Sequence, residues 1–216
     1  MSMTADDQKR VAGELAASWV ESGMVVGLGT GSTAVHAIRA IGERIASGDL
    51  REVVGIPTSR ASEAEATAAG VPLTTLAEQP TIDLTIDGAD EVDPQLNLIK
   101  GAGGAQWREK IVAQASVREV IVADASKPVD VLGTRFPVPV EVPAFGWRPE
   151  ADYLDDMGAT VTVRRGADGA EVVTDEGNWI LDCAFGPIAD AARLASLLDR
   201  RAGIVAHGLF LGLATD

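Results

Sequence analysis

The sequence predicts an α/β fold, in which helices cover a parallel β-sheet and a smaller α+β domain follows. Three observations support this prediction. Between residues 24 and 124, short β-branched segments alternate with alanine-rich helical segments. The strand segments are apolar almost throughout, which is typical of parallel strands buried on both faces. Near residue 132 the pattern changes to a Pro-rich extended segment, followed by shorter strands and two helices.

The first helix is expected at about residues 5–22. Pairs of one strand and one helix then follow in the order that a parallel sheet requires. They are "MVVGLG" (24–29) with "GSTAVHAIRAIGERIAS" (31–47), "EVVGIP" (52–57) with "TSRASEAEATAAG" (58–70), and "IDLTID" (82–87) with "GGAQWREKIVAQAS" (103–116), before a last strand "EVIVAD" (119–124).

The second domain is expected to have the split β-α-β-β-α-β order. Its segments are the extended "RFPVPVEVPAFGWRP" (135–149), a helix at about 149–157, "ATVTVRR" (159–165), "WILDCAF" (179–185) after a hairpin at "TDEGNW" (174–179), the helix "PIADAARLASLLDRR" (187–201) and "GIVAHGLF" (203–210). We therefore predict a catalytic domain at 1–131, a small α+β domain at 132–206, and a return of 207–216 to the first domain.

Composition excludes several classes of function. A net charge of −14 argues against a surface for nucleic acid or for anionic lipid. The single cysteine, Cys183, permits no internal disulfide, and "MSMTADDQKR" lacks a signal-peptide core, so we expect a soluble cytoplasmic protein without a membrane span. With only two histidines, a zinc site is not expected, and any metal would be a hard cation on carboxylates.

Four predicted strands end in small polar or charged residues, and ligands bind beyond the carboxyl ends of parallel strands. The first such ending, "GLGTGST" (27–33), offers backbone N–H groups and the hydroxyls of Ser32 and Thr33 to an anion. A dinucleotide is not expected, because Ser32 replaces the third glycine of G-x-G-x-x-G and no acidic residue follows the next strand. We favour a single small phosphate; the alternative is a tight turn that only needs glycine.

The third ending, "LTIDGADEVDP" (84–94), crowds four acidic side chains together. A Mg²⁺ ion, a basic partner or chemistry that needs carboxylates would each explain the crowding, and a solvated acidic turn is the plain alternative. Lys100, in "LIKGAGGAQWREK" (98–110), is a candidate partner for Asp87 or Asp90. In the following helix, Glu109 shares a face with apolar residues, where desolvation favours proton transfer near neutral pH.

In this order and spacing, "GLGTGSTA", "IPTS", "TIDGADEVD", "LIKGAGGAQWREK" and "VADASK" resemble the type A ribose-5-phosphate isomerases. The later "FPVPVEV" and "GIVAHGLF" are also similar to that family. The resemblance implies a Rossmann-like domain with a small ferredoxin-like domain, no cofactor or metal, and a homodimer or homotetramer. It also implies interconversion of ribose 5-phosphate and ribulose 5-phosphate in the non-oxidative branch of the pentose phosphate pathway.

The resemblance implies Glu109 as the catalytic base, with Lys100 stabilising an oxyanion and with Asp87 and Asp90 assisting ring opening. Because a metal-held hydride shift needs a metal site, proton transfer through an enediolate is the expected route. The implied substrate contacts are Thr30, Gly31, Ser32, Thr33, Asp87, Gly88, Ala89, Asp90, Lys100, Gly101, Ala102, Gly103 and Lys127, with the phosphate at the Ser32–Thr33 end.

Two departures from the family pattern are visible: Ala102 stands in a loop that is more uniformly glycine in relatives, and relatives usually continue through one more strand after "LGLATD". Two other functions remain open at this point. The scaffold would also suit a non-catalytic phosphosugar sensor, although such a sensor has no need of Glu109. An acyl-CoA transferase relative would instead use a carboxylate nucleophile.

Overall fold

The computed structural model describes residues 3–216, which form two compact units. Unit 1 contains the chain as far as Ala89, then Arg108–Lys127 and Leu213–Asp216; unit 2 contains Asp90–Trp107 and Pro128–Gly212. The predicted domains at 1–131 and 132–206, with 207–216 returning to the first, stay a prediction.

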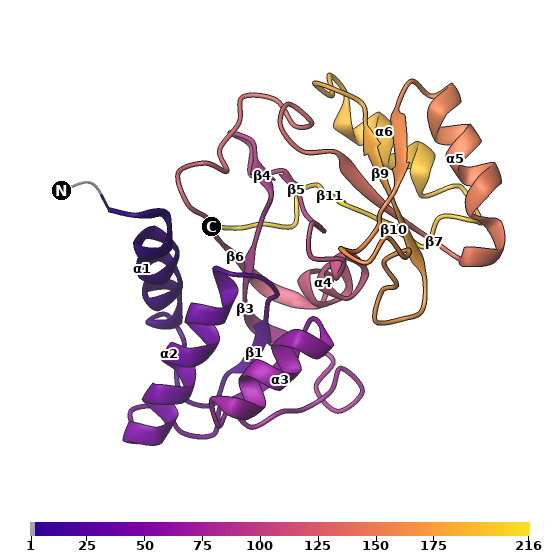
Figure 1. Cartoon of the computed structure of the whole chain (residues 1–216). Helices are drawn as coiled ribbons and strands as arrows, with labels where there is room; N and C mark the ends of the chain where they lie inside the picture. Colours follow the sequence, from indigo (N-terminus) through magenta and orange to yellow (C-terminus); the bar gives the residue numbers. More distant parts are fainter. Residues whose placement is uncertain (1–2) are drawn as a thin grey trace. The chain divides into compact units, whose positions relative to one another are not determined.

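Unit 1 is built on a parallel four-stranded sheet in the order β2-β1-β3-β6 (Figure 1), which confirms the α/β fold class. The strands are β1 (Val25–Leu28), β2 (Val54–Pro57), β3 (Ile82–Gly88) and β6 (Ser116–Val122). Since β1 pairs in parallel with both β2 and β3, the carboxyl ends of these three strands meet at one edge of the sheet. Apart from Glu109, which lies in a helix, the candidate site residues of unit 1 are at this edge of the sheet or in the loops that follow it.

Helices α1 (Ala5–Ala17), α2 (Ala34–Ser47) and α3 (Arg60–Ala68) belong to unit 1, together with α4 (Gln106–Gln114) from Arg108 onward. Helix α1 packs against α2 (Figure 1) and ends at Ala17, five residues before the predicted end. The reason is a competing donor: Arg44 of α2 donates to the carbonyls of Ala17 (2.6 Å) and Val20 (3.0 Å), so these oxygens need no further helical turn.

Unit 2 contains the antiparallel sheet that the second half of the sequence predicts. Its strands β7 (Val138–Val142), β8 (Thr160–Val163), β9 (Trp179–Ala184) and β10 (Ala206–His207) lie in the order β10-β7-β9-β8. The 3-10 turn η1 (Ala144–Gly146) and α5 (Trp147–Asp156) connect β7 to β8, and α6 (Ala191–Leu198) connects β9 to β10. The chain therefore follows the expected βαββαβ order of a small ferredoxin-like domain.

A second sheet in unit 2 was not predicted from the sequence. It joins β4 (Glu91–Val92), β5 (Leu98–Ile99) and β11 (Leu209–Phe210) in the order β11-β5-β4. Each strand has only two residues, too few to show a period of hydrophobicity. Asp90 and Lys100, two of the predicted site residues, lie directly at its strand ends.

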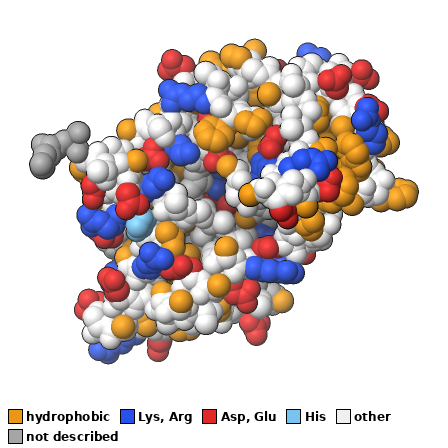
Figure 2. All heavy atoms as spheres, in the orientation of Figure 1, with side chains coloured by type: hydrophobic (Ala, Val, Ile, Leu, Met, Phe, Trp, Pro, Cys, Tyr) orange, Lys and Arg blue, Asp and Glu red, His pale blue; other side chains and the backbone are white. Residues whose placement is uncertain are grey.

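The surface of unit 2 has hydrophobic side chains gathered over the region of α5 (Figures 1 and 2). Phe145, in the turn before α5, is fully exposed. Within residues 3–216, no helix is both long and apolar enough to cross a membrane.

Candidate active site

The loop between β1 and α2 lies against the end of β3. The N–H of Gly29 donates to the Ile86 carbonyl (3.0 Å), and the N–H of Thr30 donates to Oδ1 of Asp87 (3.0 Å). A Cβ atom at position 29 would lie 2.4 Å from Oδ1 of Asp87, so only glycine permits this approach. Two predicted site residues that are 57 positions apart, Thr30 and Asp87, are thereby brought together.

Two hydroxyl residues that the sequence analysis did not include in the site lie beside this loop. The Thr30 hydroxyl is 2.7 Å from the hydroxyl of Thr58 and donates to the hydroxyl of Ser59 at 2.7 Å. Thr58 and Ser59 follow β2 in the "IPTS" motif, so their position at a strand end was the available indication. Thr58 and Ser59 hold the side chain of Thr30, while Asp87 orients its backbone N–H.

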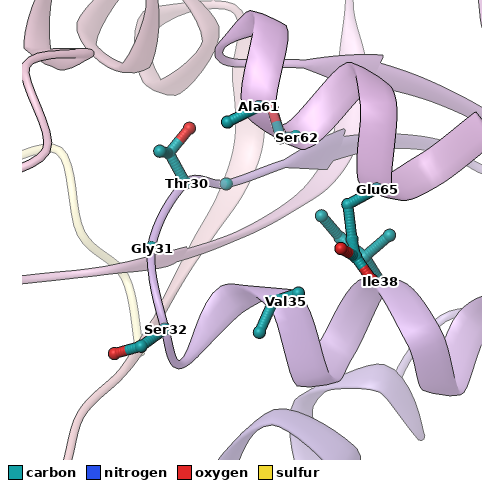
Figure 3. Close-up of a pocket in the computed structure, with 9 residues that line it drawn as sticks. Thr30, Gly31, Ser32, Val35, Ile38, Ala61, Ser62 and Glu65 are labelled. Carbon is teal, nitrogen blue, oxygen red and sulfur yellow. The ribbon is translucent and has the colours of Figure 1, made fainter.

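A pocket of about 340 Å³ opens beside this loop, lined by residues of the loop, α2 and α3. Figure 3 shows Ile38 of α2 beside Glu65 of α3 at one end of the pocket and Ser32 at the other end. Glu65 pairs with Arg39 at 2.5 Å. Because Arg39 and Glu65 offset each other, this end of the pocket offers a phosphate no net positive charge, and the Ser32 end, at the start of α2, is the better site.

The start of α2 keeps donors available near Ser32. Thr33 is the N-cap residue of α2, and its hydroxyl makes no cap hydrogen bond. Gly31 adopts a φ of 111°, a conformation that residues with a side chain rarely adopt, and this turns the chain into the helix. The positive end of the helix dipole and the Thr33 hydroxyl therefore both suit an anion.

Backbone N–H groups donate to the carboxylates of the crowded acidic segment. The Asp87 carboxylate accepts from the N–H groups of Thr30 (3.0 Å) and Gly88 (2.7 Å), and Asp90 accepts from the N–H of Ala102 at 2.8 Å. Asp87 is fully buried. Each carboxylate thus has its own set of amide donors, which offsets the cost of placing like charges close together.

The other two carboxylates of this segment have structural roles. Glu91 is fully buried and accepts from the backbone N–H groups of Gly133, Arg135 and Phe136 at 2.6, 2.5 and 2.8 Å. Asp93 accepts from two N–H groups of the turn that follows it, each at 2.8 Å. In the described part of the chain, no three His, Cys, Asp or Glu side chains are grouped to hold a metal ion.

We expect Glu91→Gln to lower the free energy of unfolding by about 1–3 kcal/mol, because one amide N–H that now meets a carboxylate oxygen would meet an NH₂ group instead. Urea unfolding followed by circular dichroism measures this change. Glu43→Gln, on the exposed face of α2, is the matched control and should leave stability unchanged. Equal stability of Glu91→Gln and the control would contradict this account of the loop at 133–136.

Lys100 follows β5 and is almost completely buried, with 2% exposure. Its N–H donates to the Gly208 carbonyl (2.9 Å), and its Nζ lies 5.4 Å from the centre of the Phe210 ring. The antiparallel pairing of Glu91 with Ile99 makes Asp90 and Lys100 the next opposed residues. This register supports the predicted pairing of Lys100 with an aspartate.

The loop after Lys100 is glycine-rich, with positive φ at Gly101 (105°) and Gly104 (77°). Ala102, which departs from the family pattern, is exposed and is absent from the residues with positive φ among residues 3–216. The backbone therefore accepts alanine at this position without strain. Asp90, Lys100 and the residues from Gly101 to Gly103 are neighbours within unit 2.

Glu109 lies in the first turn of α4 and has 5% exposure, which confirms the prediction that it occupies the apolar face of this helix. Val112, one turn later, is also buried. A carboxylate in such surroundings has few water molecules to solvate its charge. The position is therefore suited to a group that takes up and releases a proton.

Lys127 follows β6 in the "DASK" turn, and its N–H donates to the Asp124 carbonyl at 3.1 Å. The Ser126 hydroxyl, together with its N–H and the charge of Lys127, lowers the pKa of Asp124 below its usual value. Asp124 stays ionised beside Lys127 at neutral pH. This turn places one cation at the end of β6, at the same edge of the sheet as the loop at 29–33.

Comparison with known proteins gives one consistent result. A family model described as Ribose 5-phosphate isomerase A (phosphoriboisomerase A) matches residues 54–216. The chain is 54% identical over 213 residues to "Ribose-5-phosphate isomerase A" of Chloroflexus aurantiacus, a match that covers 99% of this chain and 89% of the relative.

Solved structures agree with the sequence comparison. The structure of ribose 5-phosphate isomerase A from Methanocaldococcus jannaschii superposes with a TM-score of 0.93 at 40% identity, covering 97% of this chain and 93% of that one. A D-ribose-5-phosphate isomerase in complex with phospho-erythronic acid superposes with a TM-score of 0.96 at 36% identity, covering 98% and 93%. The similarity extends through both units.

Proposed function

Because the chain belongs to the ribose-5-phosphate isomerase A family, we propose that its buried Lys100 and Glu109 carry the reaction of that family. The chain is an isomerase that interconverts D-ribose 5-phosphate and D-ribulose 5-phosphate. The observation that supports the assignment of residues is the burial of these two ionisable side chains, which precede and follow a glycine-rich loop in the sequence. Burial of charge is costly, and buried ionisable groups beside a motif of the family are candidates for functional positions.

The proposed reaction moves one proton between adjacent carbons. Glu109 removes the proton from C2 of the open-chain aldose, and the electron pair moves toward C1 so that an enediolate forms with negative charge on O1. Lys100 stabilises that charge. Glu109 then returns the proton to C1 while the O2 proton is transferred to O1, which leaves a carbonyl at C2.

The two aspartates act on hydroxyl groups in this proposal. Asp87 and Asp90 assist opening of the furanose ring and accept protons from sugar hydroxyls. Their carboxylates are held by backbone N–H groups, which supports fixed positions during the reaction. A fixed carboxylate can exchange protons with a substrate hydroxyl without first reorganising.

Substrate binding is proposed to use two sets of donors. The loop at 30–33 and the start of α2 bind the phosphate, and Lys127 contributes a positive charge. The sugar is surrounded by the residues that the family motifs identify. These are Asp87, Gly88, Ala89, Asp90, Lys100, Gly101, Ala102 and Gly103.

The assay that tests this function also tests metal dependence. We expect chelator-treated protein to convert ribose 5-phosphate to ribulose 5-phosphate at the rate of untreated protein, because the carboxylates of the acidic segment already accept backbone N–H groups. A coupled assay or NMR of the sugar measures the conversion. Loss of turnover that Mg²⁺ or Mn²⁺ restores would show that the acidic segment holds a metal.

We also propose that the enzyme acts in the cytoplasm, in the non-oxidative branch of the pentose phosphate pathway, as a homodimer or homotetramer. Cys183, the one cysteine of the sequence, is buried, and burial raises the pKa of its thiol. An unreactive single thiol is compatible with a reducing compartment. The exposed Phe145 and the hydrophobic surface around it support association between copies, which light scattering measures.

A further inference from the structure

Arg164 connects the antiparallel sheet of unit 2 to the glycine-rich loop after Lys100. Its Nε and Nη2 donate to the two carboxylate oxygens of Asp182, at 2.9 and 2.5 Å. Its Nη1 donates to the carbonyls of Gly101 (2.8 Å) and Ala102 (3.0 Å). The side chains of Arg164 and Asp182 are mostly buried, with 16% and 22% exposure. Such buried, bidentate geometry is rigid.

The peptide between Gly101 and Ala102 is held at both ends. Its carbonyl accepts from Arg164, and its N–H donates to the Asp90 carboxylate at 2.8 Å. In a trans peptide the C=O and N–H point in opposite directions, and the described residues contain no cis peptide bond. This peptide therefore lies between a cation on one side and a candidate catalytic carboxylate on the other.

Arg164 also orients the next peptide, between Ala102 and Gly103, through its carbonyl. Because its carbonyl, that of Ala102, accepts from Arg164, the N–H of Gly103 points away from the guanidinium. Gly103 is exposed. The loop thus presents an N–H donor at a position that the family motifs assign to substrate binding.

Within the loop itself, one hydrogen bond closes the turn: the N–H of Gly104 donates to the Gly101 carbonyl at 3.0 Å. Gly101 and Gly104 both adopt positive φ, and glycine has more accessible backbone conformations than any other residue. Partners outside the loop must therefore add to the order that this single hydrogen bond provides. Arg164 holds the carbonyl of the peptide between Gly101 and Ala102, and Asp90 holds its N–H.

We propose that Arg164, oriented by Asp182, is a positioning residue for the reaction: it fixes the carbonyls of Gly101 and Ala102 so that Lys100 and the Gly103 N–H meet the sugar oxygens in one geometry. The inference rests on the proposed function, because it takes this loop to face the substrate. Arg164 donates to the backbone and to Asp182, so its effect on catalysis is indirect.

A lysine cannot replace this arginine. The planar guanidinium reaches a carboxylate and two carbonyls at once, whereas an ammonium group is a compact charge on a flexible chain. Arg164→Lys therefore keeps the positive charge but cannot contact Asp182 and both carbonyls at once. Arg164→Ala removes the charge and these contacts and leaves a partly exposed space that free guanidinium can enter.

The neighbouring Arg165 is a matched control. It also pairs with one carboxylate, Glu171 at 2.8 Å, and donates to one carbonyl, that of Gly169 at 2.7 Å. Its side chain is 55% exposed, and both of these partners are in its own hairpin. Arg165→Ala therefore removes the same kinds of contact without touching the loop after Lys100.

The test compares steady-state kinetics and hydrogen exchange of the wild type, Arg164→Ala, Arg164→Lys and Arg165→Ala. We expect kcat/KM of both Arg164 variants to fall roughly 10²-fold, mainly through kcat, because small displacements of catalytic groups cost about this much. Millimolar guanidinium should restore part of the kcat of Arg164→Ala. Amide exchange in residues 101–104 should accelerate in both Arg164 variants and stay at the wild-type rate in Arg165→Ala.

Folded Arg164→Ala with wild-type kcat, or unchanged exchange in residues 101–104, would overturn the proposal. If Arg164→Ala does not fold, Arg164→Lys decides: wild-type kcat in that variant would show that only the charge is needed and would overturn it equally. An inactive wild type would contradict the proposed function instead, and the exchange measurement would still test the positioning of the loop.

Discussion

Glu109→Gln is expected to lower kcat by roughly 10²–10⁴-fold, the usual contribution of a positioned general base, while KM changes little. The amide keeps the size of the side chain and its place in the first turn of α4, but it cannot accept the C2 proton. Glu109 is buried, with 5% exposure, so water is poorly placed to act in its stead. Steady-state kinetics with ribose 5-phosphate measure both constants.

Glu109→Asp is the informative companion variant, since it keeps a carboxylate but withdraws it by one methylene. Its kcat should lie between those of the wild type and Glu109→Gln, because a misplaced base still transfers protons slowly. Near wild-type turnover by Glu109→Gln would mean that Glu109 is only a helix residue. The base would then have to be sought at Asp87 or Asp90.

Lys100→Ala is expected to lower kcat by roughly 10²–10³-fold, the effect of removing one donor to a developing oxyanion. The charge on O1 develops only in the transition state, so the loss should appear in kcat rather than in KM. Lys100 is held between the Gly208 carbonyl at its N–H and the Phe210 ring at its ammonium, which places the charge firmly. Kinetics in both reaction directions should show the same loss.

Lys127→Ala is the matched removal of a lysine from a proposed binding role. Lys127 is expected to attract the phosphate in the ground state and the transition state alike, so its loss should raise KM and leave kcat nearly unchanged. The reverse pattern, with kcat lost in Lys127→Ala and KM raised in Lys100→Ala, would show that the two roles are exchanged.

Features with local causes could be predicted from the sequence. The parallel sheet followed from apolar strands that alternate with helices, and the burial of Glu109 followed from its spacing to Val112 along one helix. The gathering of Thr30 and Asp87 at one edge of the sheet followed from the rule that parallel strands end at one edge, whereas their hydrogen bond was not predicted. In each case a short stretch of chain, or the topology alone, determines the outcome.

Features with distant causes could not be predicted. The carboxylate of Glu91 accepts from backbone N–H groups 42–45 positions later. Because almost every residue has a backbone N–H, the sequence does not indicate which of them will donate. Arg164 reaches a carbonyl 62 positions earlier, and nothing in "VRRGADG" distinguishes it from Arg165. The sheet of β4, β5 and β11 is likewise determined by long-range pairing of very short strands.

The most direct test of the account is the fate of the C2 hydrogen during turnover in D₂O. If Glu109 carries a proton through an enediolate, ribose 5-phosphate that has been interconverted many times should gain solvent deuterium at C2, and the ribulose 5-phosphate at C1. NMR of the wild-type reaction measures this incorporation, and Glu109→Gln should slow it in parallel with kcat. Complete retention of the original hydrogen over many turnovers would show a hydride shift and would contradict the account.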